Sequence, residues 1–224
     1  MPLLQRTLFA YHHRAIHVPR VRRVAAALAA RIGRAASLLD VGAGDGTVAR
    51  DLGLLVGAAR VAGVDVKVRP GAAVEVVRYD GERLPFPDAA FEVVVLSDVL
   101  HHCARPDVVL AESLRVASRA VAIKDHFRFG PVSEKILLLM DLAGNAAPAV
   151  HVRGTYFSPR DFAELVAEAG ARIAGLTWPL RIHDLPFRLI TQDRLQFAAL
   201  VERAARVEPV ERAEPLPRPG RGAS

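Results

Sequence analysis

The segment "LLDVGAGDGTVAR" (38–50) constrains the fold of this chain more than any other. It places Gly42, Gly44 and Gly46 at alternate positions, after a short apolar run and before residues with helical spacing. Glycine allows a sharp turn between a strand and a helix, and it lets a ligand approach the backbone closely. In doubly wound α/β folds, the loop after the first strand binds ligands. The segment therefore predicts a fold of this class with a binding loop.

Two familiar glycine loops do not match this spacing. A dinucleotide loop, GxGxxG, would need a third glycine where the chain has Thr47, and a phosphate loop would need a lysine that is missing near the segment. What remains is an acid, Asp40, followed after one residue by GxGxG. The loop alone leaves the identity of the ligand open.

The rest of the chain alternates short apolar runs with segments of helical length, which indicates parallel strands joined by helices. Valine-rich runs are typical of strands that are buried on both faces. The expected strands span 37–41, 60–66, 74–79, 91–97, 120–126, 171–178 and 194–202. The expected helices follow Pro19, span 46–55, start at Pro106, span 131–143, and run from the N-cap Ser158 to Gly170.

Length and composition favour one main domain. The chain has 224 residues, 51% hydrophobic and 24% charged, which is the balance of a globular protein. We expect an N-terminal helical lid over 1–34, a main domain over 35–205, and a disordered tail over 206–224. No apolar run is long enough for a membrane span and the N-terminus does not resemble a signal peptide, so a cytoplasmic location is expected. The single cysteine, Cys103, excludes a thiolate zinc cluster, and no metal site is expected.

Positive charge is concentrated at the N-terminus. The net charge is +6, and residues 1–34 carry 7 arginines and no acid, so removing those 7 charges from +6 leaves −1 for the remainder. A nucleic-acid enzyme needs basic residues around its active cleft, so this distribution argues against a nucleic-acid partner. Peripheral contact of the basic N-terminus with an anionic lipid surface stays open.

Two further segments, taken together with the loop, carry a resemblance to a known family. They are "GVDV" (63–66) and "YDGERLPFPDAAFEVVVLSDVLHH" (79–102). In this order and spacing the segments resemble the class I S-adenosylmethionine-dependent methyltransferases, in particular their small-molecule, type 11-like branch. The resemblance extends over 37–203. It implies a Rossmann-like, doubly wound, mostly parallel seven-stranded sheet with an antiparallel last strand, and S-adenosylmethionine as the cofactor.

An acid at the end of the second expected strand is the first candidate for binding this cofactor. Asp65 follows Asp40 by 25 residues, at the place where an acid accepts hydrogen bonds from both hydroxyls of an unphosphorylated ribose. The glycines of the loop would lie against the cofactor. The full set of cofactor-binding candidates is Asp40, Gly42, Gly44, Asp65, Asp80, Gly81 and Ser97.

The resemblance implies roles for the remaining members of this set. Asp80 would accept a hydrogen bond from the adenine amino group, with the backbone of Gly81 alongside. Asp40 would orient the glycine loop and the ammonium group of the methionine part, and the backbone of Ser97 would contact the same ammonium.

Histidines after the fourth and fifth expected strands are the candidate catalytic residues, His101 and His126. An acceptor hydroxyl must lose its proton during methylation, and histidine has a suitable pKa for accepting it. His126 ends the run "KDH" with Lys124 and Asp125, which is costly at a buried strand end unless the residues are paired or border a cavity. Alternation along the strand sends Lys124 and His126 to one face and Asp125 to the other.

These features predict methyl transfer from S-adenosylmethionine to a small-molecule acceptor, with oxygen favoured over carbon and nitrogen as the acceptor atom. Three alternatives stay open: a nucleic-acid or protein methyltransferase, a noncatalytic S-adenosylmethionine-binding module, and a nicotinamide oxidoreductase. Against the first, the fourth strand is followed by "SDVLHH" and not by an NPPY-like motif, and no added recognition domain is visible.

Overall fold

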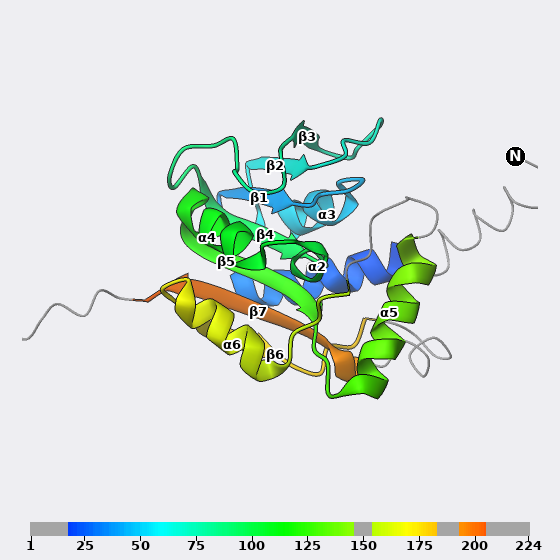
Figure 1. Cartoon of the computed structure of the whole chain (residues 1–224). Helices are drawn as coiled ribbons and strands as arrows, with labels where there is room; N and C mark the ends of the chain where they lie inside the picture. Colours follow the sequence, from blue (N-terminus) through cyan, green and yellow to red (C-terminus); the bar gives the residue numbers. More distant parts are fainter. Residues whose placement is uncertain (1–17, 146–153, 183–192, 205–224) are drawn as a thin grey trace, which may run out of the picture.

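A computed structural model describes residues 18–145, 154–182 and 193–204, and these form a seven-stranded sheet in the order β3-β2-β1-β4-β5-β7-β6 (Figure 1). Neighbouring strands from β3 to β5 are parallel, and β7 is antiparallel to both β5 and β6. The strands are β1 (Ser37–Val41), β2 (Arg60–Asp65), β3 (Glu75–Arg78), β4 (Phe91–Ser97), β5 (Ala117–His126), β6 (Ala171–Thr177) and β7 (Gln196–Arg203). The Rossmann-like fold with an antiparallel last strand is confirmed.

Helices cover both faces of the sheet. Figure 1 shows α2 and α3 on one face and α4 and α6 on the other, while α5 stands at one edge of the molecule, on the right of the view. The helices are α2 (Val18–Ile32), α3 (Thr47–Val56), α4 (Pro106–Val116), α5 (Pro131–Asn145) and α6 (Pro159–Glu168), with short 3-10 turns η2 (Leu100–His102) and η3 (Asp193–Leu195).

Strand alternation divides the core into two apolar layers. In β4, Val93 and Val95 pack with the α2 and α3 layer, whereas Val94 and Leu96 pack with the α4 and α6 layer. All four of these side chains are almost completely buried. Continuous valine runs therefore form the central strands because both of their faces are covered.

The expected element boundaries agree closely with the structure, with one clear difference in β5. The apolar run suggested a start at residue 120, but β5 begins at Ala117, which pairs with Phe91 at the start of β4. The apolar run did not indicate this extension, because the polar residues Ser118 and Arg119 precede it. The predicted N-cap of α6 is confirmed, since Ser158 Oγ accepts from the backbone N–H of Asp161 and the Asp161 carboxylate accepts from that of Ser158.

Parts of the expected domain organisation lie outside the described residues. This applies to the tail over 206–224 and to the first half of the lid over 1–34. The second half of the lid is α2, whose side chains Val24 and Leu28 are fully buried against the sheet. Within the described residues, α2 is thus an integral layer of the fold.

The sheet reverses its winding direction between β1 and β4. From β1 the chain proceeds outward through β2 to β3, and from β4 it proceeds in the opposite direction to β5. Val41 pairs with Leu96, so the loops after both strands begin side by side at the carboxyl edge of the sheet. Such a switch point is the usual ligand site of an open α/β sheet.

Candidate active site

The glycine loop follows β1 at this switch point and turns through left-handed backbone conformations. Gly42, Gly44 and Gly46 have φ values of 75°, 59° and 72°. The backbone N–H groups of Gly42 and Ala43 both donate to Val64 O, at 2.8 and 3.1 Å, which ties the loop to β2. A Cβ atom at position 42 would lie 2.6 Å from Val99 Cγ2. The loop therefore needs glycine for its conformation and for the close approach of the segment after β4.

This close approach gives a stability prediction. Gly42→Ala should lower the free energy of unfolding by about 1–2 kcal/mol through its positive φ and by about a further 1–3 kcal/mol through the clash, because the branched Val99 side chain is stiff. Gly71→Ala is the matched control, since Gly71 has φ 72° and a Cβ atom added there would meet no other atom within 4 Å. Urea unfolding of both variants measures the difference, and equal losses would contradict the expected clash.

Asp65 lies at the carboxyl end of β2 and braces the loop. Its Oδ2 accepts from the backbone N–H of Gly44 at 2.8 Å, and its Oδ1 accepts from that of Lys67 at 2.9 Å. A carboxylate has about four acceptor positions, so each oxygen can accept a further hydrogen bond. The geometry suits an acid that holds the loop and also receives two hydroxyl groups.

Asp40 is buried beneath the loop. Burial, followed by the nearby charges of Asp65 and Asp45, raises the pKa of Asp40 to about 8. A cationic group bound beside this side chain would favour its charged form and lower that pKa. Such a position fits the ammonium group of an amino acid ligand.

Asp80 and Gly81 lie on the loop after β3. Asp80 Oδ1 accepts from the backbone N–H groups of Glu82 and Arg83, each at 2.8 Å, and these bonds lower the pKa of the exposed carboxyl. Gly81 has φ 95° and approaches Val66 after β2. The Asp80 carboxylate thus stabilises the turn that follows it. A hydrogen bond from adenine to this carboxylate stays a proposal.

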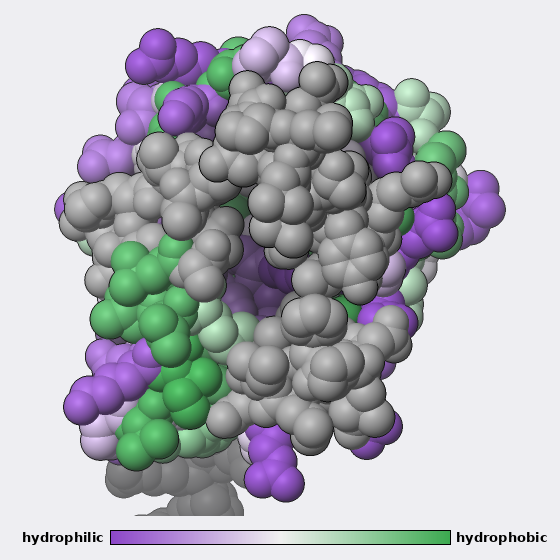
Figure 2. All heavy atoms as spheres, turned by 90° about the vertical axis from the view of Figure 1, so that its right-hand side faces the viewer, coloured by the Kyte–Doolittle hydropathy of each residue, from purple (hydrophilic) through white to green (hydrophobic). Residues whose placement is uncertain are grey.

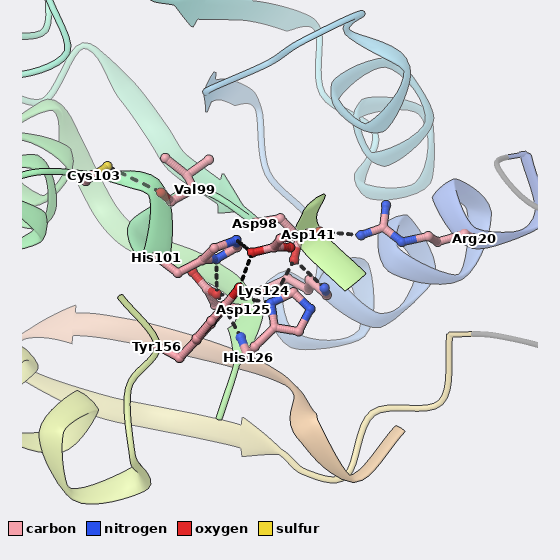
Figure 3. Close-up of polar contacts among 10 residues, drawn as sticks. All are labelled: Arg20, Asp98, Val99, His101, Cys103, Lys124, Asp125, His126, Asp141 and Tyr156. Atoms are coloured by element: carbon pink, nitrogen blue, oxygen red, sulfur yellow. Dashed lines mark hydrogen bonds and ion pairs between the residues drawn. The ribbon is translucent and has the colours of Figure 1, made fainter. Parts of the chain in front are cut away.

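A buried polar cluster occupies the neighbouring end of the sheet (Figure 3). At its centre His101, on η2, is completely buried, and its Nδ1 lies 2.5 Å from Asp125 Oδ1. On the other side of the ring, Nε2 lies 3.2 Å from Asp141 Oδ2 of α5 without forming a well-aligned hydrogen bond. The Tyr156 hydroxyl donates to the same Asp141 oxygen at 2.5 Å, and the Tyr156 ring stacks on His101.

The two carboxylates keep His101 protonated. Burial alone would lower the pKa of His101, but Asp125 and then Asp141 raise it to about 10. Burial likewise opposes ionisation of Asp125, and His101 nevertheless holds the pKa of that carboxyl well below its usual range. At neutral pH, His101 is a cation between two anions and has no free capacity to accept a proton.

Asp98 joins the ends of β4 and β5 to α2. Its φ of 58° is in the left-handed region, where aspartate is tolerated better than most residues. Asp98 Oδ1 accepts from Lys124 Nζ, and Oδ2 accepts from Arg20 Nη2 at 2.5 Å. Burial would raise the pKa of Asp98, but Lys124 and Arg20 hold it well below the usual range. The buried Lys124 is therefore paired, as its position requires.

His126 completes the cluster at the last position of β5. Its Nδ1 lies 3.4 Å from Asp125 Oδ1 and 3.6 Å from Asp98 Oδ1. Burial, followed by the charge of Lys124, lowers the pKa of His126, so its ring is neutral at pH 7. The expected alternation holds in part, because Lys124 and His126 share Asp98 while Asp125 bonds His101. However, the strand ends here, so the His126 ring also lies close to Asp125.

Two sets of donor atoms in the cluster have the spacing of metal ligands, His101 with Asp125 and His126, and His101 with His102 and Asp141. His101 is common to both sets, and it is already engaged by the Asp125 carboxylate. Because the Asp125 carboxylate pairs with His101, we interpret the cluster as a proton-bearing network, and the absence of a metal site stays a prediction.

The site combines residues that the sequence suggested with others that it did not. The ends of β1, β2, β3 and β4 place the cofactor candidates along one edge, with Ser97 half-buried at the end of β4 next to Lys124. Arg20, Asp98 and Asp141 were not predicted. The directly adjacent "SD" in "LSDVLHH" was the available signal for Asp98, and nothing local marks Arg20 or Asp141.

Comparisons with known proteins identify a related domain and a shared fold. Residues 39–120 match a family model described as a methyltransferase domain. No curated protein matches the chain.

Solved structures share the fold at low sequence identity. A chain from the complex of the Haloferax volcanii Trm112 methyltransferase activator with an inferred methyltransferase has a TM-score of 0.67 at 14% identity, covering 91% of this chain and 97% of that one. The 1,6-didemethyltoxoflavin-N1-methyltransferase of Burkholderia thailandensis, solved with bound 1,6-didemethyltoxoflavin and S-adenosylhomocysteine, has a TM-score of 0.60 at 18% identity, covering 83% of this chain and 79% of that one. The magnesium protoporphyrin IX methyltransferase of Synechocystis PCC 6803, with bound S-adenosylhomocysteine, has a TM-score of 0.52 at 17% identity, covering 91% and 89%.

The family model spans the glycine loop, Asp65, Asp80 and the histidines after β4, and the structural likeness extends over most of the chain. Residues 39–120 therefore match a methyltransferase domain, and the chain shares its fold with solved methyltransferases, two of which hold S-adenosylhomocysteine.

Proposed function

We propose that the chain methylates a hydroxyl group of a small molecule, with His126 as the general base. The observation that carries this proposal is a neutral, almost fully buried histidine at the end of β5, next to the switch point between β1 and β4. His101, the other candidate, is already protonated because of Asp125. We therefore assign His101 to positioning and His126 to proton transfer.

The residues at the switch point fit S-adenosylmethionine. The glycine loop presents a backbone without side chains at Gly42 and Gly44, Asp65 offers acceptors for a ribose diol, and the raised pKa of Asp40 suits an adjacent ammonium. When bound, this cofactor supplies an activated methyl group on a sulfonium sulfur, whose bond to carbon breaks as the bond to the acceptor oxygen forms. Catalysis then depends mainly on holding the acceptor in line.

The surroundings of His126 suit it to accept the acceptor proton. If Nδ1 carries its proton toward Asp125 and Asp98, Nε2 is the nitrogen that accepts. The imidazolium formed in this way gains a positive charge beside two carboxylates, which stabilise it as an acid does in other Asp–His pairs. His101, anchored between Asp125 and Asp141, keeps the Asp125 carboxylate in position.

An acceptor panel tests the proposed function. The protein is incubated with methyl-tritiated S-adenosylmethionine and with phenols, hydroquinones, aliphatic alcohols and amines of similar size. We expect tritium in methyl ethers of hydroxyl acceptors, together with S-adenosylhomocysteine. Label in amine products alone would overturn oxygen as the acceptor atom, and cofactor binding without any transfer would support a noncatalytic module instead.

A further inference from the structure

An exposed apolar surface lies on α5 and the segments that flank its start. We call it the α5 patch, and it consists of Phe129, Val132, Leu139, Leu142 and Trp178. Their exposed fractions are 48%, 72%, 69%, 52% and 48%. The rings of Phe129 and Trp178 are 5.5 Å apart, which links the end of β6 to the start of α5. Figure 2 shows apolar side chains gathered on one side of this face of the molecule.

Helix α5 turns one side toward the buried polar cluster and exposes an apolar side. At about 100° per residue, Val132, Leu139 and Leu142 lie within one stripe, and Asp141 lies on the opposite side. Asp141 points inward to His101 and Tyr156, whereas the stripe is exposed. The same helix thus closes the polar cluster on its inner side and presents aliphatic side chains on its outer side.

Basic residues accompany this apolar stripe. Lys135 lies within it, and the exposed Arg181 and Arg194 lie near Trp178, whose Nε1–H donates to Arg194 O. Glu134 is the one acid in the first turn of α5. In the sequence, residues 1–17 add Arg6 and Arg14 and no acid. Aliphatic and aromatic side chains beside Lys and Arg are typical of helices that lie in the interface of an anionic membrane.

We propose that the α5 patch docks on the surface of an anionic lipid bilayer. Apolar side chains would enter the boundary between headgroups and acyl chains, and the basic residues would contact lipid phosphates. A symmetric dimer through the same patch would bring two surfaces of the same positive sign together, each with Lys135, Arg181 and Arg194, which is unfavourable. None of the described helices combines the length and the apolar composition of a membrane span.

The single tryptophan of the chain is a built-in reporter, because Trp178 belongs to the patch. The full-length protein is mixed with vesicles of phosphatidylcholine alone or with phosphatidylglycerol. We expect co-sedimentation with the anionic vesicles, a blue shift of tryptophan emission, quenching by brominated acyl chains, and release at high salt. Absence of binding, with a dimer in light scattering, would overturn the proposal in favour of a second copy.

A pair of variants separates the patch from general charge attraction. Val132→Ser combined with Leu139→Ser should reduce vesicle binding about tenfold or more, because two exposed aliphatic side chains no longer enter the lipid. Leu54→Ser is the matched control, since Leu54 is 77% exposed on α3, and it should bind like the unaltered protein. Equal vesicle binding by the double variant and by Leu54→Ser would overturn the proposal. Protection of Trp178 from acrylamide quenching in the absence of lipid would also overturn it, because other residues of the chain would then cover the patch. The test does not depend on methyl transfer.

Discussion

Replacing Asp65 with alanine is expected to weaken S-adenosylmethionine binding about a hundredfold. Hydrogen bonds to a charged acceptor contribute about 1.5–3 kcal/mol each, and about 1.4 kcal/mol corresponds to a factor of ten. The variant would lose the acceptors proposed for the ribose diol and the bond from the Gly44 N–H that braces the loop. Titration calorimetry with S-adenosylhomocysteine measures the change without any acceptor.

A control substitution isolates the contribution of the site. Asp88 precedes β4, at the edge of the sheet opposite the candidate site, and its exposed carboxylate pairs with Arg115. Asp88→Asn removes this carboxylate and should leave the affinity for S-adenosylhomocysteine within about twofold of that of the unaltered protein. Asp65→Asn keeps one oxygen acceptor and should bind with intermediate affinity. If Asp65→Ala bound as tightly as the unaltered protein, the ribose would lie elsewhere and the proposed orientation of the cofactor would be wrong.

His126→Gln is expected to lower kcat by a factor of about 10²–10⁴, the usual contribution of a general base. The affinity for S-adenosylhomocysteine should stay nearly unchanged, because His126 lies at the end of β5 and the cofactor candidates lie on the loops after β1 to β4. His102→Gln is the control. His102 neighbours His101 on η2, and its loss should reduce kcat much less than the loss of His126.

The pH dependence of kcat provides a second readout for the base. Burial and Lys124 lower the pKa of His126 below its ordinary value of 6.5, so the neutral, proton-accepting form prevails above that pKa. Activity should therefore be constant near pH 7 and fall only at pH values below the ordinary histidine pKa of 6.5, with the acid limb absent in His126→Gln. An acid limb that persists in this variant, or a limb centred well above pH 7, would contradict the assignment of His126.

The glycine loop and the positions of the acids at the ends of β1 and β2 could be predicted from the sequence because local patterns determine them. The strand runs, the GxGxG spacing and the acids at strand ends are written in consecutive residues, and the structure brings the ends of β1 to β4 together through sheet pairing. The capping box of α6 is local in the same sense.

The polar cluster could not be predicted in the same way, because it depends on contacts between distant segments. Arg20 reaches Asp98 across 78 positions, and Asp141 meets His101 only because α5 packs beside η2. The protonation of His101 follows from these contacts, since an isolated histidine titrates near pH 6.5. His101 and His126, which looked alike in the sequence, thereby differ in charge, and only His126 is left neutral to act as the proposed base.

A crystal structure of the protein with S-adenosylhomocysteine tests these assignments most directly. We predict that the ribose hydroxyls bind Asp65 and that the amino acid end lies over the glycine loop and Asp40. The sulfur should face His126, and the distance between the sulfur and the imidazole ring should leave room for a methyl group and an acceptor oxygen. A nucleoside bound away from Asp65, or a sulfur that faces away from the ends of β4 and β5, would contradict the proposed site.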